Sequence, residues 1–376
     1  MADSFDVIIL GAGCAGLSLA MRLAAAGPLK QRVLLLEQRA RYRHDRHWCF
    51  WESAVSESWP VQASQRWSRF EVRLDHRRIE HESATEPYAL IESGRFYAQA
   101  LSVLHRHPRL QLRRGLTVAG SLRVGRRGLL VPTSQGVFEA PYVIDTRAER
   151  PRPGLGIWQS FLGYEIEVDA PLFDPKVATL MDFEPQSTSG LAFLYLLPRS
   201  RTRALLEWTV FDRNPQPAEG LRGDLERAMA QRIGGQTARI SYRESGILPM
   251  TVASPTPPLT ATLGRIRCGL DRGMARPSSG YAFSRIQAWA DQCALRIRAG
   301  DPPCPPLADA PWIKAMDQQF LAWLGQNPAD GARRLYGLFE KTPTDRLVRF
   351  LAGRARPLDG LAVAAALGGC LPCKPP

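Results

Sequence analysis

The sequence has no long hydrophobic run, few histidines and no familiar metal-binding motif. No stretch of its 376 residues approaches the ~18–20 consecutive apolar residues that a membrane-spanning helix needs, so none is predicted. The motifs HExxH, GxSxG and the Walker loop are missing, which argues against zinc hydrolases, α/β-hydrolases and P-loop enzymes. The six histidines lie between residues 44 and 107 without metal-ligand spacing, so we expect no metal site.

Cysteine is also scarce, and its spacing suggests no disulfide framework. The seven cysteines are scattered and odd in number, which fits a reducing compartment. Cys370 and Cys373 form a CxxC pair, but no second pair completes a zinc site and no βαβ pattern surrounds it, so we expect a structural role. The first residues are acidic where a signal peptide is basic, so we expect a cytoplasmic protein.

What the chain does have is an ordinary globular composition with a basic excess. Hydrophobic residues make up 45% and charged residues 23%, which excludes a disordered chain, and 376 residues suffice for two or three domains. The 49 Lys and Arg outnumber the 36 Asp and Glu, which gives a formal charge of +13. This excess favours a polyanionic partner, either nucleic acid or the anionic face of a membrane.

Residues 6–37 have the pattern of a βαβ unit that binds a dinucleotide. A short apolar run is followed by a glycine-rich turn, a helical pattern and a second apolar run that ends in an acid. Glycines let backbone N–H groups approach a pyrophosphate at the helix N-terminus, and the acid accepts hydrogen bonds from a ribose hydroxyl. The residues predicted to bind the dinucleotide here are Gly11, Gly13, Ala15, Gly16 and Glu37.

Further along, the hydrophobic periodicity changes from βα to β and back. Strands are expected at 116–138, 142–145, 159–168, 177–183, 192–197 and 204–211, the last four in a sheet of their own. Helices are expected at 94–107, 221–233, 281–298, 312–324 and 331–351. The last of these helices is expected to break at Pro343, and a tail of small residues follows it.

Two groups of residues on predicted strands could carry chemistry. The aromatic run at 47–51 suggests a wall for a large apolar ligand or a cation, although the edge of a core strand explains it equally well. Glu207 interrupts an apolar strand; it either faces water or faces an apolar cavity, where desolvation would raise its pKa and make it a general acid. Asp182 is a similar acid, and its strand could pair with that of Glu207.

A third group lies in the loop 269–281. Glycines follow the end of a predicted strand, and a helix is expected to start near Ser278 or Ser279, either of which suits an N-cap. Such a helix start offers N–H donors to a pyrophosphate or a flavin ring, whereas the alternative is a plain loop.

Together these segments resemble the flavin-dependent lycopene cyclases, which belong to the glutathione-reductase-like flavoproteins. The resemblance follows the family's order over about residues 5–290, and beyond them the chain matches only as helical. The matching motifs are Gly11-x-Gly-x-x-Gly16 with Glu37, Asp45-Arg-His-Trp-Cys-Phe-Trp51, Val143-Ile-Asp-Thr-Arg147, Leu180-Met-Asp-Phe183, Leu206-Glu-Trp-Thr-Val-Phe211, Gly246-Ile-Leu-Pro-Met250 and Arg276-Pro-Ser-Ser-Gly-Tyr281.

The resemblance implies an α/β fold: a Rossmann-like FAD-binding domain of the glutathione-reductase-like type, interrupted by a β-sheet substrate domain, with a helical C-terminal region. It implies FAD that is active when reduced, NAD(P)H as a candidate reductant, and a linear polyene such as lycopene drawn from a membrane. In that family an acid protonates the terminal double bond and a nearby double bond attacks the resulting cation. Loss of a proton then leaves a β-ring, so the reaction is redox-neutral although it needs reduced flavin.

The family's functional positions map onto named residues of this chain. The implied catalytic residues are Glu207, as the acid, and Asp182. The implied FAD-binding residues, besides the N-terminal set, are Asp145, Gly269, Asp271, Gly273, Ser279 and Gly280. The implied substrate-binding residues are Trp48, Phe50, Trp51, Trp208 and Tyr281.

The resemblance also implies a discontinuous domain order. The FAD-binding domain is expected from residues 1–50, 93–155 and 256–300, with 51–92 as a linker or part of the substrate domain. The β-sheet substrate domain is expected at 156–255 and the helical region at 301–376.

Three positions depart from the family pattern. His47 stands where Thr is usual, Trp208 where Tyr or Glu is common, and Leu270-Asp-Arg272 where small residues pack against the flavin. These departures leave the identity of the isoprenoid open, including a terpenoid other than a carotenoid. An FAD-dependent oxidoreductase, such as an isoprenoid reductase or a monooxygenase, is the alternative, although the GDAxH-type loop of hydroxylases is missing.

Two segments of the chain are rich in basic residues. Seven arginines between residues 106 and 127 fall on a helix end and a meander with almost no aromatics between them, so we expect no nucleic-acid partner. Segment 331–357 carries seven Lys or Arg, and its apolar residues at helical spacing are Leu335, Leu338, Phe339, Leu347 and Phe350. We expect this basic amphipathic segment to bind the inner face of the cell membrane; packing on the protein's own core is the alternative.

Overall fold

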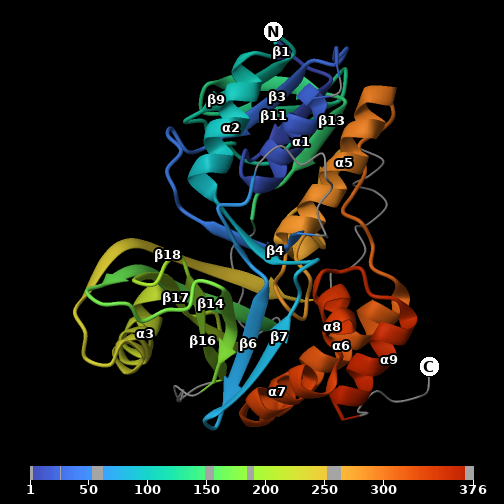
Figure 1. Ribbon diagram of the computed structural model, residues 1–376. Coiled ribbons are helices and arrows are strands. Elements are labelled where there is room, and N and C mark those ends of the chain that lie inside the picture. The colour runs from blue at the N-terminus through green and yellow to red at the C-terminus, as the bar shows by residue number, and fades with distance from the viewer. Residues whose placement is uncertain are drawn as a thin grey trace.

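The computed structural model describes residues 3–25, 27–52, 62–148, 156–183, 190–251 and 264–368. In Figure 1 an α/β layer lies at the top, a large twisted sheet at the lower left and the C-terminal helices at the lower right. The described part of the chain begins at the top of this view and ends among the C-terminal helices at the lower right. Cys370 and Cys373 lie outside the described residues.

The upper layer is built on a parallel sheet in the order β19-β13-β2-β3-β9. Its strands are β2 (Val7–Leu10), β3 (Val33–Glu37), β9 (Leu110–Arg114), β13 (Tyr142–Asp145) and β19 (Arg265–Arg267). Helices α1 (Cys14–Ala25), α2 (Ser93–His105) and α5 (Phe283–Ala299) pack on the face that carries Val7 and Ile9. The other face, with Ile8 and Leu10, is covered by β1 (Asp3–Ser4), β10 (Arg123–Val124), β11 (Leu129–Thr133) and β12 (Gly136–Ala140). Because both faces are covered, the central strands are almost wholly apolar: β2 has the sequence VIIL, and β3 has VLLLE.

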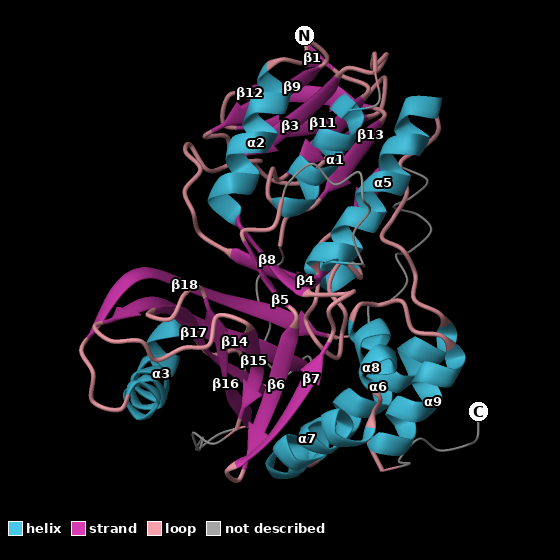
Figure 2. Ribbon diagram, viewed as in Figure 1, coloured by secondary structure: helices cyan, strands magenta, loops and turns pink. Residues whose placement is uncertain are grey.

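The second sheet has the strand order β18-β14-β17-β16-β15-β6-β7. Its strands are β6 (Arg69–Leu74), β7 (Arg77–Glu82), β14 (Ile157–Val168), β15 (Val177–Asp182), β16 (Leu191–Pro198), β17 (Arg203–Asp212) and β18 (Ala238–Met250). Helix α3 (Ala218–Ile233) covers one face of the sheet. A small sheet of β4 (His47–Trp51), β5 (Gln65–Trp67) and β8 (Tyr88–Glu92) lies between the two large ones (Figure 2).

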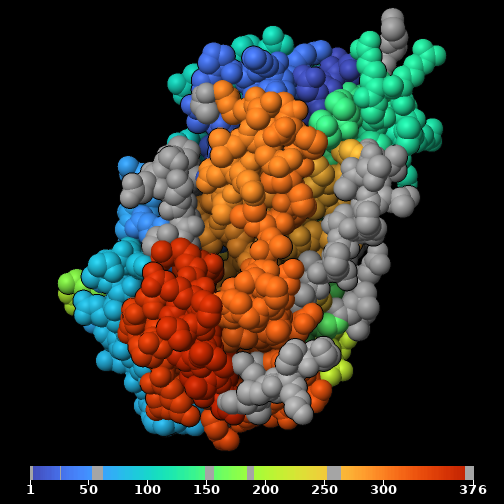
Figure 3. Space-filling view, turned by 90° about the vertical axis from the view of Figure 1, so that its right-hand side faces the viewer, coloured from blue at the N-terminus to red at the C-terminus, as the bar shows by residue number. Residues whose placement is uncertain are grey.

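The C-terminal region consists of α6 (Pro311–Gln326), the 3₁₀ turn η3 (Pro328–Asp330), α7 (Gly331–Lys341), α8 (Thr344–Leu351) and α9 (Pro357–Ala366). Another 3₁₀ turn, η2 (Leu270–Arg272), lies between β19 and α5. The predicted break at Pro343 is confirmed, because α7 ends before it and α8 begins after it. Helix α9 lies in the tail of small residues, within the region 301–376 that was expected to be helical, although no separate helix was predicted there. Seen from the side, α5 and the C-terminal helices form one broad outer face (Figure 3).

The expectation that segment 331–357 lays its apolar face on a membrane is wrong. Its five apolar residues, Leu335, Leu338, Phe339, Leu347 and Phe350, are all buried in the protein's own core. An amphipathic pattern indicates that one face of a helix is buried, but it does not indicate what covers that face. In this protein the large sheet covers it. Within the described residues, no helix is long and apolar enough to cross a membrane.

Two further details differ from the sequence-based expectations. Helix α5 begins at Phe283 after Ala282, so neither Ser278 nor Ser279 is its N-cap. Strand β18 and the β6–β7 hairpin were not predicted at all. Strand β18 alternates exposed and half-buried positions and includes a glycine and a proline, so its hydrophobic pattern is weak.

Candidate functional site

The glycine-rich turn between β2 and α1 is shaped by close backbone contacts. Gly11 has a φ of +92°, which only glycine adopts readily. A Cβ on Gly16 would lie 2.1 Å from the carbonyl oxygen of Gly11. Helix α1 can therefore pack this closely against the turn only because Gly16 has no side chain. A Cβ on Gly13 would instead meet nothing nearer than Arg39 Nη2 at 3.9 Å, so this backbone faces open space. Gly16 therefore serves packing, whereas Gly13 borders a cavity.

Glu37 closes the same turn from the end of β3. Its Oε2 accepts a hydrogen bond from the Ala12 N–H at 2.9 Å, and its Oε1 accepts one from the Arg39 N–H at 2.9 Å. Burial opposes ionisation, but the hydrogen bonds and charge of Arg39 outweigh it and hold the pKa of Glu37 below its usual value. Glu37 is therefore an ionised side chain held beside the glycine-rich turn by these hydrogen bonds.

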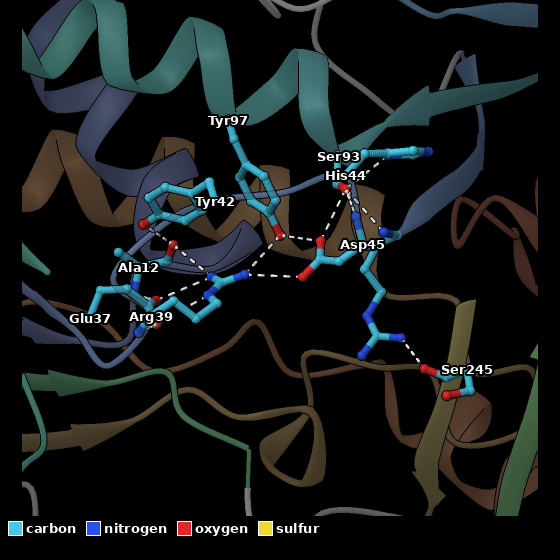
Figure 4. A network of polar contacts seen from close by, with 10 residues as sticks. Ala12, Glu37, Arg39, Tyr42, His44, Asp45, Ser93, Tyr97 and Ser245 are labelled. Atoms are coloured by element: carbon cyan, nitrogen blue, oxygen red, sulfur yellow. Dashed lines mark hydrogen bonds and ion pairs between the residues drawn. The ribbon is translucent and has the colours of Figure 1, made fainter. Parts of the chain in front are cut away.

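A polar network leads from this turn toward the large sheet (Figure 4). Arg39 Nη1 lies 3.2 Å from Asp45 Oδ2, and Asp45 Oδ1 accepts hydrogen bonds from the hydroxyls of Tyr97 and Ser93. The next residue, Arg46, donates a hydrogen bond to the carbonyl oxygen of Ser245 on β18. The network therefore holds the 45–51 segment between the two large sheets.

A single cavity of about 1110 Å³ extends from the glycine turn to the large sheet and the C-terminal helices. At its nucleotide end the predicted residues that line it are Gly11, Gly13, Ala15, Glu37, Asp145, Ser279 and Gly280. Gly269, Asp271 and Gly273 are not in its wall; from the same loop Arg267, Leu270 and Met274 are. Asp145 is held by Arg147 at 2.8 Å and Arg265 at 2.9 Å.

Glu207 lies in the wall of the other part of this cavity. Strand alternation turns Leu205, Glu207 and Thr209 into the cavity and Leu206 and Trp208 toward α3. Desolvation by burial, reinforced by the negative charge of Glu244, raises the pKa of Glu207 to about 8. The Thr209 hydroxyl, which donates to Glu207 Oε1 at 3.1 Å, opposes this rise in part. Glu207 therefore keeps its proton at neutral pH.

Glu244 on β18 is a site residue that the sequence did not reveal. Gly163 of β14 pairs with Glu207 on one side and with Glu244 on the other, so all three point to one face. His47 donates its backbone N–H to Glu244 Oε2 at 2.9 Å, and His47 Nδ1 lies 2.8 Å from Glu244 Oε1. The sequence pattern that could have indicated Glu244 is the alternation of Ile240, Tyr242 and Glu244 along one strand. Charged residues beside them obscured this pattern.

Asp182 is not part of this cluster. Its strand β15 pairs with β16, which separates it from β17, so the expected pairing with the strand of Glu207 is wrong. Asp182 is 1% exposed, and its Oδ2 lies 3.4 Å from Arg232 of α3, on the face opposite the cavity. The structure therefore does not bring Asp182 and Glu207 together.

The aromatic residues predicted to bind substrate divide into two groups. Trp48 and Tyr281 line the cavity, and Trp48 stacks on Phe283 with ring centroids 5.9 Å apart. Phe50, Trp51 and Trp208 do not line it; they are fully or almost fully buried in three different hydrophobic cores. Along β4 the side chains alternate, so Trp48 and Phe50 pack toward α5 whereas Trp51 packs toward Tyr88.

A row of neutral hydroxyls lies beside Glu207. Tyr195 pairs with Glu207 across β16 and β17, and its hydroxyl lies 2.8 Å from that of Tyr88. The Tyr88 hydroxyl lies 3.3 Å from that of Tyr281. Burial raises the pKa of Tyr281 to about 12, so the row adds polarity to the cavity without adding charge.

The far part of the cavity is apolar. Its apolar lining residues come from the large sheet, from α6 to α8 and from the residue just after α9: Leu180, Met181, Phe193, Leu205, Phe211, Met316, Phe320, Leu335, Leu338, Phe339, Phe350, Leu351 and Leu367. The C-terminal helices thus close the chamber that holds Glu207. Such an apolar lining suits an apolar ligand.

The fold places the chain in a broad class. A geranylgeranyl bacteriochlorophyll reductase-like protein from Thermoplasma acidophilum superimposes with a TM-score of 0.64 at 13% identity, over 99% of this chain and 98% of that one. A flavin-dependent brominase superimposes with a TM-score of 0.63 at 14% identity, over 97% of this chain and 98% of that one. The protein therefore has the Rossmann-type fold of FAD-dependent oxidoreductases and monooxygenases, as predicted.

Sequence comparison narrows the class to one family. The model of the family described as "Lycopene cyclase protein" matches residues 6–373. The lycopene beta-cyclase of Pantoea ananas is 28% identical, over 96% of this chain and 94% of that protein. The lycopene beta-cyclase of Paracoccus sp. (strain N81106 / MBIC 01143) is 28% identical, over 98% and 97%. The chain belongs to the lycopene cyclase family, which confirms the resemblance.

Proposed function

We propose that the protein cyclises the end groups of a linear isoprenoid, most simply lycopene to β-rings, with Glu207 as the acid. The observation that carries this proposal is a carboxyl group with a pKa of about 8 in the wall of a cavity whose far part is apolar. A carboxylic acid that remains protonated at neutral pH can donate a proton to a carbon–carbon double bond.

FAD fits the nucleotide end of the cavity. The open space beside Gly13, the N-terminus of α1 and the fixed carboxylate of Glu37 suit a pyrophosphate and a ribose. When bound in its reduced form, FAD supplies an electron-rich surface that stabilises a nearby carbocation. NAD(P)H is the reductant that we propose for it.

The chain's own residues account for the proton steps. The O–H bond of Glu207 breaks as a C–H bond forms at the terminal double bond, and the tertiary cation that results is attacked by a neighbouring double bond. The cyclised cation then loses one proton, which restores a carboxylic acid in the site, so nothing is oxidised or reduced overall. Trp48 presents an aromatic ring to the cavity, and the apolar lining excludes water that would capture the cation.

The experiment compares Glu207→Gln with Asp182→Asn in the flavin-loaded protein, with lycopene as substrate. Glu207→Gln keeps the size and polarity of the side chain but removes the proton, so turnover should fall by at least about 10³-fold. Asp182→Asn should cost far less, because Asp182 lies on the other face of the sheet. If Glu207→Gln binds flavin and cyclises within about tenfold of the unaltered protein, Glu207 is not the acid.

We also propose that the protein binds the inner, anionic face of the cell membrane through α9 rather than through α7 and α8. Leu358 and Leu361 of α9 are each 66% exposed and one helical turn apart. Exposed basic residues, Arg354 and Arg356, precede the helix, and Leu367 just after it lines the cavity. Exposed leucines beside basic residues suit an anionic lipid surface, which is where an isoprenoid would be found.

A further inference from the structure

Two acidic side chains flank one glycine in the large sheet. Across the sheet, Glu244, Gly163 and Glu207 are in register on adjacent strands. A Cβ on Gly163 would lie 3.3 Å from Cγ of Glu244 and 3.4 Å from Cβ of Glu207. Because Gly163 has no side chain, β14 places no side chain between the two acids at this position.

His47 fixes Glu244 through both of its carboxylate oxygens. The backbone N–H of His47 lies 2.9 Å from Oε2, and Nδ1, when it carries the proton, donates to Oε1 at 2.8 Å. The side chains of His47 and Glu244 are each 2% exposed. The sequence showed that His47 departs from the family's usual Thr, and the structure gives this histidine a partner.

Other charged and titratable groups complete the surroundings of the pair. His47 Nε2 lies 3.9 Å from Oε2 of Glu165, which is itself paired with Arg199 and Arg203. The rings of His44 and Tyr242 contact the His47 ring, with centroids 4.7 Å and 5.0 Å away. The charge of Arg46 acts on Glu207 in the opposite direction to that of Glu244. Glu165 is therefore neutralised by arginines, whereas Glu244 and Glu207 face each other over Gly163.

We propose that Glu244 is a positioning residue that keeps the proton on Glu207. His47 holds both side-chain oxygens of Glu244 in place, and the negative charge of Glu244 beside Gly163 makes ionisation of Glu207 unfavourable. This inference rests on the proposed function, in which Glu207 is the proton donor. It assigns the carboxylate of Glu244 no contact with the reacting carbon.

The test is an infrared titration of the protein without substrate, in which the C=O band of a protonated carboxyl is followed with pH. The band of Glu207 is assigned by its loss in Glu207→Gln, and in the unaltered protein it should disappear with a midpoint near pH 8. In Glu244→Gln the midpoint should fall by at least about one pH unit, because the like charge is gone. In activity, the alkaline limb of the pH profile should move to lower pH by the same amount, which a purely structural role would not cause.

The matched control is Glu165→Gln. Glu165 is another acidic residue on the same face of β14 as Gly163, but it pairs with Leu205 and Tyr242 rather than with Glu207. Its replacement should therefore leave the titration midpoint of Glu207 unchanged. If Glu244→Gln does not fold, Glu244→Thr removes the same charge with a residue suited to strands. An unchanged midpoint in the folded variant overturns the inference. Because the titration needs no substrate, a lowered midpoint in a protein that forms no cyclic product supports the pairing and rejects only the proposed function.

Discussion

At the scale of single residues, the site depends on which face of a strand each side chain occupies. Glu207 could be predicted as a site residue only through the family motif, because a lone carboxyl group in an apolar strand fits a water-facing position as well as a cavity-facing one. Its neighbour Trp208 could not be placed, since alternation fixes only that the two face opposite sides. Glu244 escaped prediction because it is brought to Glu207 by pairing between strands distant in sequence, which no local pattern encodes.

The raised pKa of Glu207 has a consequence for stability. An unfolded glutamate ionises near 4.5 and the folded one near 8, so between these pH values the folded state holds the extra proton. The free energy of unfolding should therefore fall as pH rises through this window, by up to about 1.4 kcal/mol per pH unit from this group. Glu207→Gln removes this contribution, and the comparison is made by denaturant unfolding at several pH values. A pH dependence identical in the two proteins would contradict the raised pKa.

Gly13 offers a clean test of the cofactor site. Gly13→Val should abolish flavin retention, because its side chain would enter the space assigned to the pyrophosphate, yet the fold should persist, because a Cβ there meets no atom closer than 3.9 Å. The measurements are flavin absorbance per protein and the melting temperature. Gly16→Val is the contrasting control, which should destabilise the fold through its contact with the carbonyl of Gly11. Undiminished flavin in Gly13→Val would show that the nucleotide site is misassigned.

At the scale of elements, the sequence predicted where most helices and buried strands lie, but it did not predict which other elements they pack against. The four strands predicted to form a sheet of their own appear as β14–β17 of the large sheet, and the predicted helices appear as α2, α3 and α5–α8. Periodicity defined the apolar faces of α7 and α8, but it could not show that these faces cover the cavity rather than a membrane. Helix α9 was missed because its small apolar residues give it no clear polar face, so its amphipathic pattern is weak.

The proposed membrane contact of α9 is tested with the double variant Leu358→Ser and Leu361→Ser. Removing two exposed leucines should weaken binding to anionic vesicles by about tenfold or more and leave the fold intact, because neither side chain contributes to the core. Binding is measured by co-sedimentation at low and high salt, and high salt should also weaken it. Leu295→Ser is the matched control, since Leu295 is 69% exposed on another helix, α5. Equal binding by all three proteins would reject the proposed surface.

At the scale of the whole molecule, the chain crosses between its layers several times. The parallel sheet takes its strands from three separate parts of the sequence, and its last strand, β19, follows the whole large sheet in the chain. The fold class could be predicted because the N-terminal motif and the late glycine loop bracket a run of strands. The six-segment division into domains remains a prediction. The shared cavity explains why both parts are needed: its nucleotide end and its apolar part come from different layers.

The central claim is that the protein performs a redox-neutral cyclisation started by a proton from the site. The most direct test is mass spectrometry of the product formed from lycopene by the protein with reduced FAD, in ordinary and in heavy water. The account predicts a cyclic product of unchanged mass in ordinary water and a gain of deuterium at the ring in heavy water, because an exchangeable carboxyl proton is transferred to carbon. A product heavier by two hydrogens or by an oxygen atom in ordinary water would contradict the account and indicate a reductase or a monooxygenase.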